Sequence, residues 1–166
     1  NMSHSNQFKV KPFKPYLEEV RIVEDCNVIL VFCPIVSRAG TDIDAALNKL
    51  NTCSASKPAI LMVFHYTFDP DKIVPDSSRF INRGNTLTVD CLFVEDVGLL
   101  TCNRNEEALA KIVQCFKYQV LSPCFCCFAL TVILPVPQLL HRHAKSKLLV
   151  LLKFCIILKG LYIFPD

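Results

Sequence analysis

The chain has 166 residues, 52% of them hydrophobic, and a formal net charge of +3 at pH 7. Residues 1–118 contain thirteen Lys and Arg against fourteen Asp and Glu, whereas residues 119–166 contain five basic residues and a single acid, Asp166. A length of 118 residues suits one compact core and leaves no room for a second domain of ordinary size. Basic residues scattered among acids also argue against a nucleic-acid-binding surface. We therefore predict one domain over 1–118 and an apolar, basic tail over 119–166.

Ten cysteines are compatible with a disulfide framework or with free thiols. Cys33 and Cys91 lie within apolar runs, and no secretory leader pattern opens the sequence. We expect buried, reduced thiols in a cytoplasmic domain. The C-x-C-C pattern at 124–127 and the H-x-H pattern at 141–143 lack zinc-site spacing, so no metal site is predicted. No cofactor and no oligomeric state can be assigned.

In chain order, the first fifteen residues are polar and interrupted by proline, which predicts a poorly docked N-terminus. A short strand is predicted over 19–23, with a turn at Glu24 and Asp25. The run 27–35 is apolar on both faces. This pattern favours a central parallel strand covered by helices.

A helix is predicted after the loop 36–42, because Thr41 and Asp44 have the spacing of a capping box. Four apolar residues then recur with the helical period: Ile43, Ala46, Leu47 and Leu50. The apolar run 59–64 supplies the next buried strand. Strand, helix and strand together predict a parallel β-α-β unit.

Residues 65–85 consist almost entirely of turn-forming residues, and loops of this length within a compact domain are often functional. The run 86–93 alternates in hydrophobicity, which favours an edge strand. Asn105 is predicted to cap a final amphipathic helix. The fold class is therefore α/β, a small, mainly parallel sheet flanked by helices and flavodoxin- or Rossmann-like. The N-terminal residues are a poor substitute for the strand and crossover helix that usually open such folds, which suggests truncation there.

The loop after residue 35 is the first candidate site, because ligands bind beyond the carboxyl ends of parallel strands. Its predicted ligand-binding residues are Ser37, Arg38, Gly40, Thr41 and Asp42. A helix start offers unpaired N–H groups, and an arginine can add a bidentate phosphate contact. The loop matches neither G-x-G-x-x-G nor the Walker pattern. The structural alternative is that glycine makes the turn, the helix is capped and the arginine is solvated.

The segment Gly40-Thr41-Asp42-Ile43-Asp44 follows an Asn-Val-Ile-Leu-Val strand. It resembles the G-T-x-x-E segment of the nucleoside 2-deoxyribosyltransferase-like group. That resemblance implies that Asp44, at the position of the group's glutamate, is a catalytic nucleophile that attacks the sugar C1′. A carboxylate suits this chemistry because glycosidic cleavage passes through an oxocarbenium-like state. Helix capping is the alternative role of Asp44.

Residues 19–118 resemble a set of uncharacterised vertebrate single-domain α/β proteins. The resemblance rests on V-I-L-V-F-C-P-I-V-S-R-A-G-T-D-I at 28–43, P-D-S-S-R at 75–79 and T-L-T-V-D-C-L-F at 86–93. It implies an α/β fold and brings no activity with it.

Two further groups of candidate site residues lie in and beyond the long loop, and their patterns are less specific. His65 and Asp90 follow apolar runs and could approach Asp44 across the crevice. A histidine after a buried strand is also a common hydrogen-bonded core residue. Residues 77–79 could form a substrate lid, and simple solvation of the loop is the alternative.

The tail contains an uncharged run, 120–140, long enough to cross a bilayer as a helix. Pro123, Pro135 and Pro137 argue against that helix. A translated non-coding extension and a soluble helical extension are the alternatives, and the tail cysteines could also be palmitoylated.

These patterns predict a small α/β module that binds a nucleotide-like anion, a nucleotide or phosphosugar, with membrane association through the tail. A non-enzyme is favoured over an enzyme. The alternatives are an N-glycosidase or deoxyribosyltransferase-like enzyme with a carboxylate nucleophile, and a membrane-anchored interaction protein without a ligand.

Overall fold

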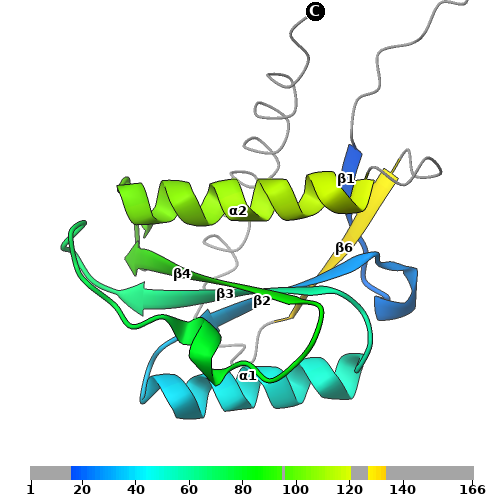
Figure 1. Ribbon diagram of the computed structural model, residues 1–166, viewed down its shortest axis with the longest axis horizontal. Helices are drawn as coiled ribbons and strands as arrows, with labels where there is room; N and C mark the ends of the chain where they lie inside the picture. Colours follow the sequence, from blue (N-terminus) through cyan, green and yellow to red (C-terminus); the bar gives the residue numbers. More distant parts are fainter. Residues whose placement is uncertain (1–15, 95, 121–126, 134–166) are drawn as a thin grey trace, which may run out of the picture.

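The computed structural model describes residues 16–94, 96–120 and 127–133. They form a six-stranded sheet, in the order β1-β6-β2-β3-β4-β5, with α1 and α2 on opposite faces (Figure 1). The elements are β1 (Tyr16–Glu19), η1 (Val23–Asp25), β2 (Val28–Pro34), α1 (Ala39–Cys53), β3 (Ala59–Tyr66), η2 (Ser77–Phe80), β4 (Thr86–Val94), β5 (Gly98–Leu99), α2 (Asn103–Val120) and β6 (Cys127–Ile133). The sheet is mixed: β1, β6, β2, β3 and β4 pair in parallel, and β4 pairs with β5 antiparallel. The predicted α/β character is confirmed.

Strand β2 supplies both layers of the core. Its even-numbered residues, such as Phe32, pack with α2, and its odd-numbered residues, such as Val31, pack with α1. Residues 28–33 are all essentially excluded from solvent. Successive side chains of a strand point to opposite faces, so a strand covered on both sides must be apolar throughout. This explains the continuous apolar run and confirms the central position predicted for it.

The predicted β-α-β unit is confirmed, since β2 pairs in parallel with β3 and α1 connects them. The predicted start of the helix is wrong. Helix α1 begins at Ala39, with Arg38 at the N-cap position and no side-chain cap. Thr41 and Asp44 therefore lie within the helix and do not form a capping box. The acid that braces the helix start is Asp42, as described below.

Two other boundaries differ from the predictions. The strand predicted over 19–23 ends at Glu19, because the chain then turns. The turn predicted at Glu24 and Asp25 is confirmed as part of a 3-10 turn, Val23–Asp25, closed by the N–H groups of Asp25 and Cys26. Helix α2 begins at Asn103, so Asn105 lies inside its first turn and is not a cap. The alternation predicted for 86–93 is confirmed, with Leu87, Val89 and Cys91 all facing α2.

Strand β6 lies beyond the domain boundary predicted at residue 118, within the predicted tail. Its seven residues lie within the 120–140 run and pair with both β1 and β2. They are therefore part of the sheet and not of a membrane-spanning helix. Within the residues that are described, no helix combines the length and the apolar character that crossing a bilayer requires. Residues 121–126 and 134–166 lie outside the described part, and with them the rest of the predicted tail.

Six cysteines of the described residues are free thiols: Cys26, Cys33, Cys53, Cys91, Cys102 and Cys115. Burial, with a smaller contribution from Asp42, raises the pKa of Cys33 to about 12, and burial likewise raises that of Cys91 to about 12. A thiol with so high a pKa is a poor nucleophile at neutral pH. These two cysteines therefore act as small core residues.

Candidate functional site

The connection between β2 and α1 is held by a carboxylate from the first turn of the helix. Asp42 Oδ2 accepts hydrogen bonds from the backbone N–H groups of Val36, at 2.8 Å, and Ser37, at 2.9 Å. The Ser37 hydroxyl donates to Asp42 Oδ1 at 3.0 Å. The loop donors nearest the end of β2 are therefore satisfied by the chain's own acid. Any external anion must bind one step further along, at the helix itself.

The first turn of α1 retains open donors. The first intrahelical bond runs from the Asp42 N–H to the Arg38 carbonyl, at 2.9 Å. The N–H groups of Ala39, Gly40 and Thr41 precede that bond, and no side chain of the described residues caps them. Unpaired N–H groups and the helix dipole make such a terminus attractive to anions. Arg38 is exposed beside it.

The turn η2 lies over the first turns of α1 (Figure 1). Phe80 Cε1 lies 3.7 Å from the position that a Cβ atom would take on Gly40, and 44% of the Phe80 side chain is exposed. The next residue, Ile81, packs against the core cluster that contains Leu47. Further on, Arg83 Nε donates to Asn51 Oδ1 at 3.1 Å. The segment 80–83 therefore runs along one side of α1.

Helical periodicity shows which predicted site residues share that side. Positions 40, 44, 47 and 51 are spaced by four, three and four residues, so they form one stripe. Asp44 is exposed on this stripe, one turn beyond Gly40. Of the predicted site residues, the structure brings Ser37 together with Asp42 and places Gly40 beside Phe80. Arg38 and Thr41 are exposed at the helix start. The roles predicted for these residues in binding, and for Asp44 in catalysis, stay predictions.

Arg83 fixes the segment that carries η2. Its guanidinium donates to the carbonyls of Ser54, at 3.0 Å, and Lys57, at 2.6 Å, and to Thr86 Oγ1 at 2.9 Å. Burial lowers the pKa of Arg83 below its ordinary value, but the group remains a cation at neutral pH. One side chain thus ties the end of α1 to the start of β4. The position of Phe80 over Gly40 depends on this tie.

His65, Ser77 and Asp90 form a second tie, from β3 and β4 to η2. Asp90 Oδ1 lies 2.7 Å from His65 Nε2 and accepts from the Ser77 hydroxyl at 2.6 Å, while Oδ2 accepts from the Ser77 N–H at 3.0 Å. Serine and histidine bind the same carboxylate and not each other, and Ser77 is 1% exposed. The group is therefore not a nucleophilic triad, whose serine must contact the histidine and face substrate. His65 and Asp90 engage each other and Ser77 instead of Asp44.

The hydrogen bonds at Asp90 set its protonation. Burial raises its pKa, but the bonds from His65 and Ser77 together outweigh burial, so the pKa lies below the ordinary value for aspartate. The carboxylate is therefore charged at neutral pH. It accepts three hydrogen bonds, of which the two from Ser77 hold η2 against the sheet.

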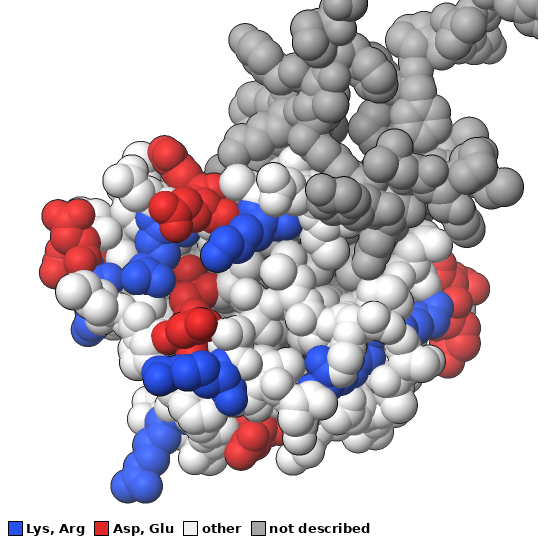
Figure 2. Space-filling model, viewed as in Figure 1, with Lys and Arg blue, Asp and Glu red and all other residues white. Residues whose placement is uncertain are grey.

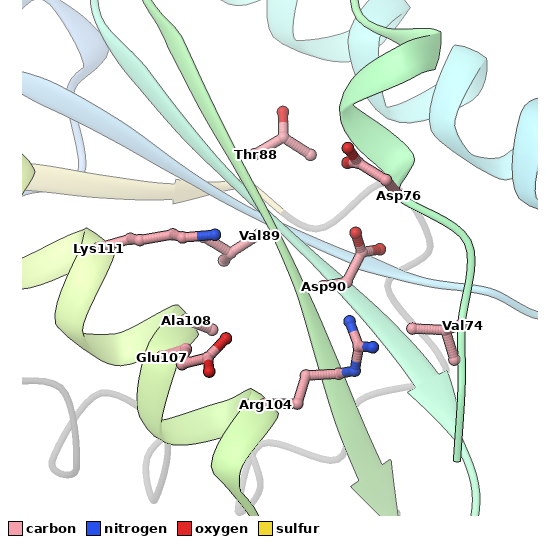
Figure 3. Close-up of a pocket in the computed structure, with 9 residues that line it drawn as sticks. All are labelled: Val74, Asp76, Thr88, Val89, Asp90, Arg104, Glu107, Ala108 and Lys111. Carbon is pink, nitrogen blue, oxygen red and sulfur yellow. The ribbon is translucent and has the colours of Figure 1, made fainter. Parts of the chain in front are cut away.

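A cavity of about 290 Å³ lies between β4, α2 and the chain that leads into η2. Its polar lining comes from Thr88 and Asp90 on β4, from Asp76 before η2, and from Arg104, Glu107 and Lys111 on α2. Figure 3 shows the three α2 side chains pointing towards β4, with Asp76 on the opposite side. The sequence did not predict this cavity. The available signals were the spacing of 104, 107 and 111, which places them on one side of a helix, and the polar residues Thr88 and Asp90 within strand β4.

The described residues contain no cluster of three metal-binding side chains. On the face shown in Figure 2, basic and acidic side chains are interspersed and form no continuous basic stripe. The chain matches no protein-family model, no curated protein and no solved structure.

Proposed function

We propose that the protein is a non-catalytic α/β binding module for a nucleotide-like anion, with its site at the start of α1. The observation that carries the proposal is the contact of the exposed Phe80 ring with Gly40, beside the open N–H groups of Ala39 to Thr41. A phosphate suits the helix terminus and Arg38, and a base suits the aromatic ring. The β2-α1-β3 crossover and the helices on both faces support a flavodoxin- or Rossmann-like relationship, in which ligands bind at this edge.

The local charge favours one phosphate over several. Arg38 supplies one positive charge, whereas Asp42 and Asp44 place two carboxylates within the same turns of α1. Each added phosphate charge is repelled by these acids, and the loop offers no lysine of the Walker type. A nucleoside monophosphate is therefore a better fit than a triphosphate.

Calorimetric titration of the full chain with adenosine 5′-monophosphate, adenosine and ribose 5-phosphate tests the proposal. We expect adenosine 5′-monophosphate to bind more tightly than either adenosine or ribose 5-phosphate. Phe80→Ala should weaken nucleotide binding about 10–100-fold, because stacking on an aromatic ring contributes about 1–3 kcal/mol per base, and should leave ribose 5-phosphate binding unchanged. Arg38→Gln should weaken both phosphate-bearing ligands.

Phe68→Ala is the matched control, because Phe68 is 74% exposed and belongs to the loop after β3. It should leave all three affinities unchanged. No detectable binding of any phosphate-bearing ligand to the folded chain would overturn the proposal.

No membrane segment at 120–140 enters the proposal, because β6 occupies the middle of that run. The cytoplasmic location and the membrane association through the remainder of the tail stay predictions. Fractionating the full chain before and after a carbonate wash checks the membrane association.

A second candidate function is cleavage of an N-glycosidic bond by Asp44. The observation that favours it is the position of the exposed Asp44 carboxylate one turn from Gly40, on the side of α1 along which segment 80–83 runs. In that reaction the carboxylate oxygen bonds to C1′ as the C1′–N bond breaks. The leaving base takes a proton from solvent, and water then attacks C1′, which releases the sugar, restores the carboxylate and returns the proton to solvent. Base release from a nucleoside 5′-monophosphate that disappears in Asp44→Asn, while nucleotide binding persists, would establish the enzyme. Equal release by the variant, or none by the native chain, would exclude it.

A further inference from the structure

Strand β4 has an outer edge that is only partly paired. Strand β5 pairs with the last two residues of β4, so within the described residues the preceding part of β4 has no strand on its outer side. The Leu92 N–H and C=O point to that outer side, because both bond the side chain of Asn105. Backbone groups alternate in direction along a strand, so those of Thr88 and Asp90 point outwards as well. An unpaired row of this kind is a template for another strand.

This edge lies between two walls. Figure 3 shows β4 running between α2 on one side and the chain that leads into η2 on the other. Thr88, Val89 and Asp90 line the cavity from β4, and the buried side chains of Val74 and Ala108 line it from the two walls. An extended peptide is the ligand whose own backbone can pair with such an edge, and a groove beside a helix can hold it.

Strand β5 indicates the direction of the added strand. It pairs antiparallel with β4, and the Leu100 N–H still donates to the Leu92 carbonyl at 3.1 Å. A peptide running antiparallel to β4 would continue this pairing towards the start of β4. In such a pair, each residue whose backbone groups point outwards exchanges two hydrogen bonds with the residue opposite. Thr88 and Asp90 therefore offer four backbone hydrogen bonds.

The α2 wall carries a spaced pair of cations. Helix α2 runs opposite to β4, because Asn105 near its start bonds Leu92 near the end of the strand. Arg104 and Lys111 both line the cavity and lie about 10 Å apart along the helix axis, with Glu107 between them. Within the described part of the chain, none of the three forms an ion pair. The wall thus presents positive, negative and positive charge in order.

These charges specify side chains on the added strand. Leu87, Val89 and Cys91 face α2, and residues opposite each other in a sheet share a face, so the peptide residues opposite these three also face α2. The outer two are four residues apart, about 13 Å along a strand, which the long side chains of Arg104 and Lys111 can span. Acidic residues at these two positions and an uncharged residue between them complement the wall.

A second copy of this chain fits the edge less well. Strand β4 itself presents only apolar residues to the α2 side, at Leu87, Val89 and Cys91. If two copies paired antiparallel through β4, their α2 helices would lie antiparallel on the same face, and the like charges of the two helices would face each other. Repulsion between like charges opposes such a dimer.

We propose that the open edge of β4 binds an extended peptide of another protein as an additional antiparallel strand. Acidic side chains of the peptide at positions i and i+4 pair with Lys111 and Arg104, and an uncharged residue midway faces Glu107. This edge is separate from the start of α1, which follows β2, so the inference is independent of the function proposed above.

Fluorescence anisotropy of the full chain with the labelled peptide Ser-Thr-Glu-Val-Thr-Val-Glu-Thr-Ser tests the pairing. Its two valines are expected opposite Thr88 and Asp90. N-methylation of both valines removes two donors to β4 and should weaken binding about tenfold or more. N-methylation of both glutamates is the matched control and should change the affinity little, because their N–H groups point away from β4. Equal weakening by the two modifications, or no binding of the unmodified peptide, would overturn the proposal.

Charge reversal tests the α2 wall. The double variant Arg104→Glu, Lys111→Glu should bind this peptide about tenfold more weakly, because two attractive pairs become repulsive. It should bind a peptide with lysines in place of both glutamates more tightly than the native chain does. Such a rescue requires a folded protein, so it separates recognition from misfolding.

The matched control for the charge reversal is Arg21→Glu, Lys49→Glu, at two exposed positions away from β4 and α2. It makes the same change in net charge and should keep the native preference for the acidic peptide. The same loss of preference in the control would show that net charge alone decides binding, and would refute the site. Self-association of the native chain that the Arg104, Lys111 double variant abolishes would assign the edge to a second copy and also overturn the proposal.

Discussion

The starts of α1 and α2, the α-helices of the described residues, are braced in the same manner by different side chains. After β2, the half-buried Asp42 carboxylate reaches back from α1 to Val36 and Ser37. After β4, the amide of Asn105, 3% exposed, reaches back from α2 and bonds the Leu92 N–H, the Leu92 carbonyl and the Leu100 carbonyl. One brace is charged and in contact with solvent, and the other is neutral and buried.

The difference explains where each half of the molecule can bind a ligand. The Asp42 brace leaves the N–H groups of Ala39 to Thr41 open to solvent, so a ligand can approach the start of α1. The Asn105 brace ties the start of α2 to Leu92 and Leu100 through buried backbone groups. The polar side chains of α2 that line the cavity, Arg104 and Lys111 among them, lie on both sides of this brace in the sequence.

The largest expected effect comes from breaking the buried brace. Asn105→Ala removes three hydrogen bonds and leaves the buried Leu92 N–H and the Leu100 carbonyl without these partners, while the Leu92 carbonyl keeps the Leu100 N–H, so the free energy of unfolding should fall by about 3 kcal/mol. Asn105→Asp should be similarly destabilising, because a carboxylate cannot donate to the carbonyls of Leu92 and Leu100. Urea unfolding measures both. Gln114→Ala, on the exposed side of α2, is the control. A loss below about 1 kcal/mol would show that the amide is not structurally important.

Weakening the hydrogen bonds that hold η2 against the sheet should have the next largest effect on stability. Asp90→Asn weakens the bonds to His65 and Ser77 and should destabilise the protein by about 2 kcal/mol at neutral pH. Because the pKa of Asp90 is lowered by folding, its contribution is complete above the ordinary aspartate pKa of about 3.9 and is lost as the pH falls through the folded value. The variant should therefore show a flatter loss of stability below about pH 4 than the native chain. If the free energy of unfolding fell equally steeply with falling pH in the two proteins, this role of Asp90 would be contradicted.

Breaking the exposed brace should have a smaller effect on stability and a distinct effect on binding. Asp42→Asn keeps one acceptor for the loop and removes a negative charge, so we expect a loss of about 1 kcal/mol in unfolding free energy. Affinity for a nucleoside monophosphate should rise, because one repelling carboxylate is gone. Calorimetry with adenosine 5′-monophosphate checks the sign. A weaker affinity would mean that the Asp42 charge takes part in binding.

The smallest expected change compares two threonines of β4. Thr88→Val should not destabilise the free protein and should raise its unfolding free energy by about 1 kcal/mol, because the buried Thr88 Oγ1 has no hydrogen bond to lose within the described residues. Thr86→Val should cost about 1 kcal/mol or more, because Thr86 Oγ1 accepts from Arg83 and donates to the Gly84 carbonyl. Equal destabilisation by the two substitutions would indicate a hidden partner for Thr88.

The sequence predicted the elements whose patterns are local. The run 28–34 had to be buried on both faces, and the period of Ile43, Ala46 and Leu50 identified the buried side of α1. Strand β6 was missed because 120–140 reads as one uncharged run. Pro123 and Pro135 bracket the shorter segment Cys127–Ile133, which has the length and the β-branched residues of a strand.

The candidate sites were predictable only in part. The loop at Ser37 to Asp42 was recognised because it follows a central strand. The reach of Asp42 back to Val36 depends on loop geometry that no spacing rule specifies. The contact of Phe80 with Gly40 and the cavity between β4 and α2 join residues far apart in the sequence. Single-sequence patterns carry no information about such contacts.

The most direct test of the proposed function is a two-dimensional NMR titration of the isotopically labelled full chain with adenosine 5′-monophosphate in phosphate-free buffer. We predict that the amide signals of Ala39, Gly40 and Thr41 and the ring signals of Phe80 shift together and saturably. Signals of Thr88 and Arg104 at the cavity should stay in place. Saturable shifts confined to other parts of the chain, or none in a protein that remains folded, would contradict binding at the start of α1.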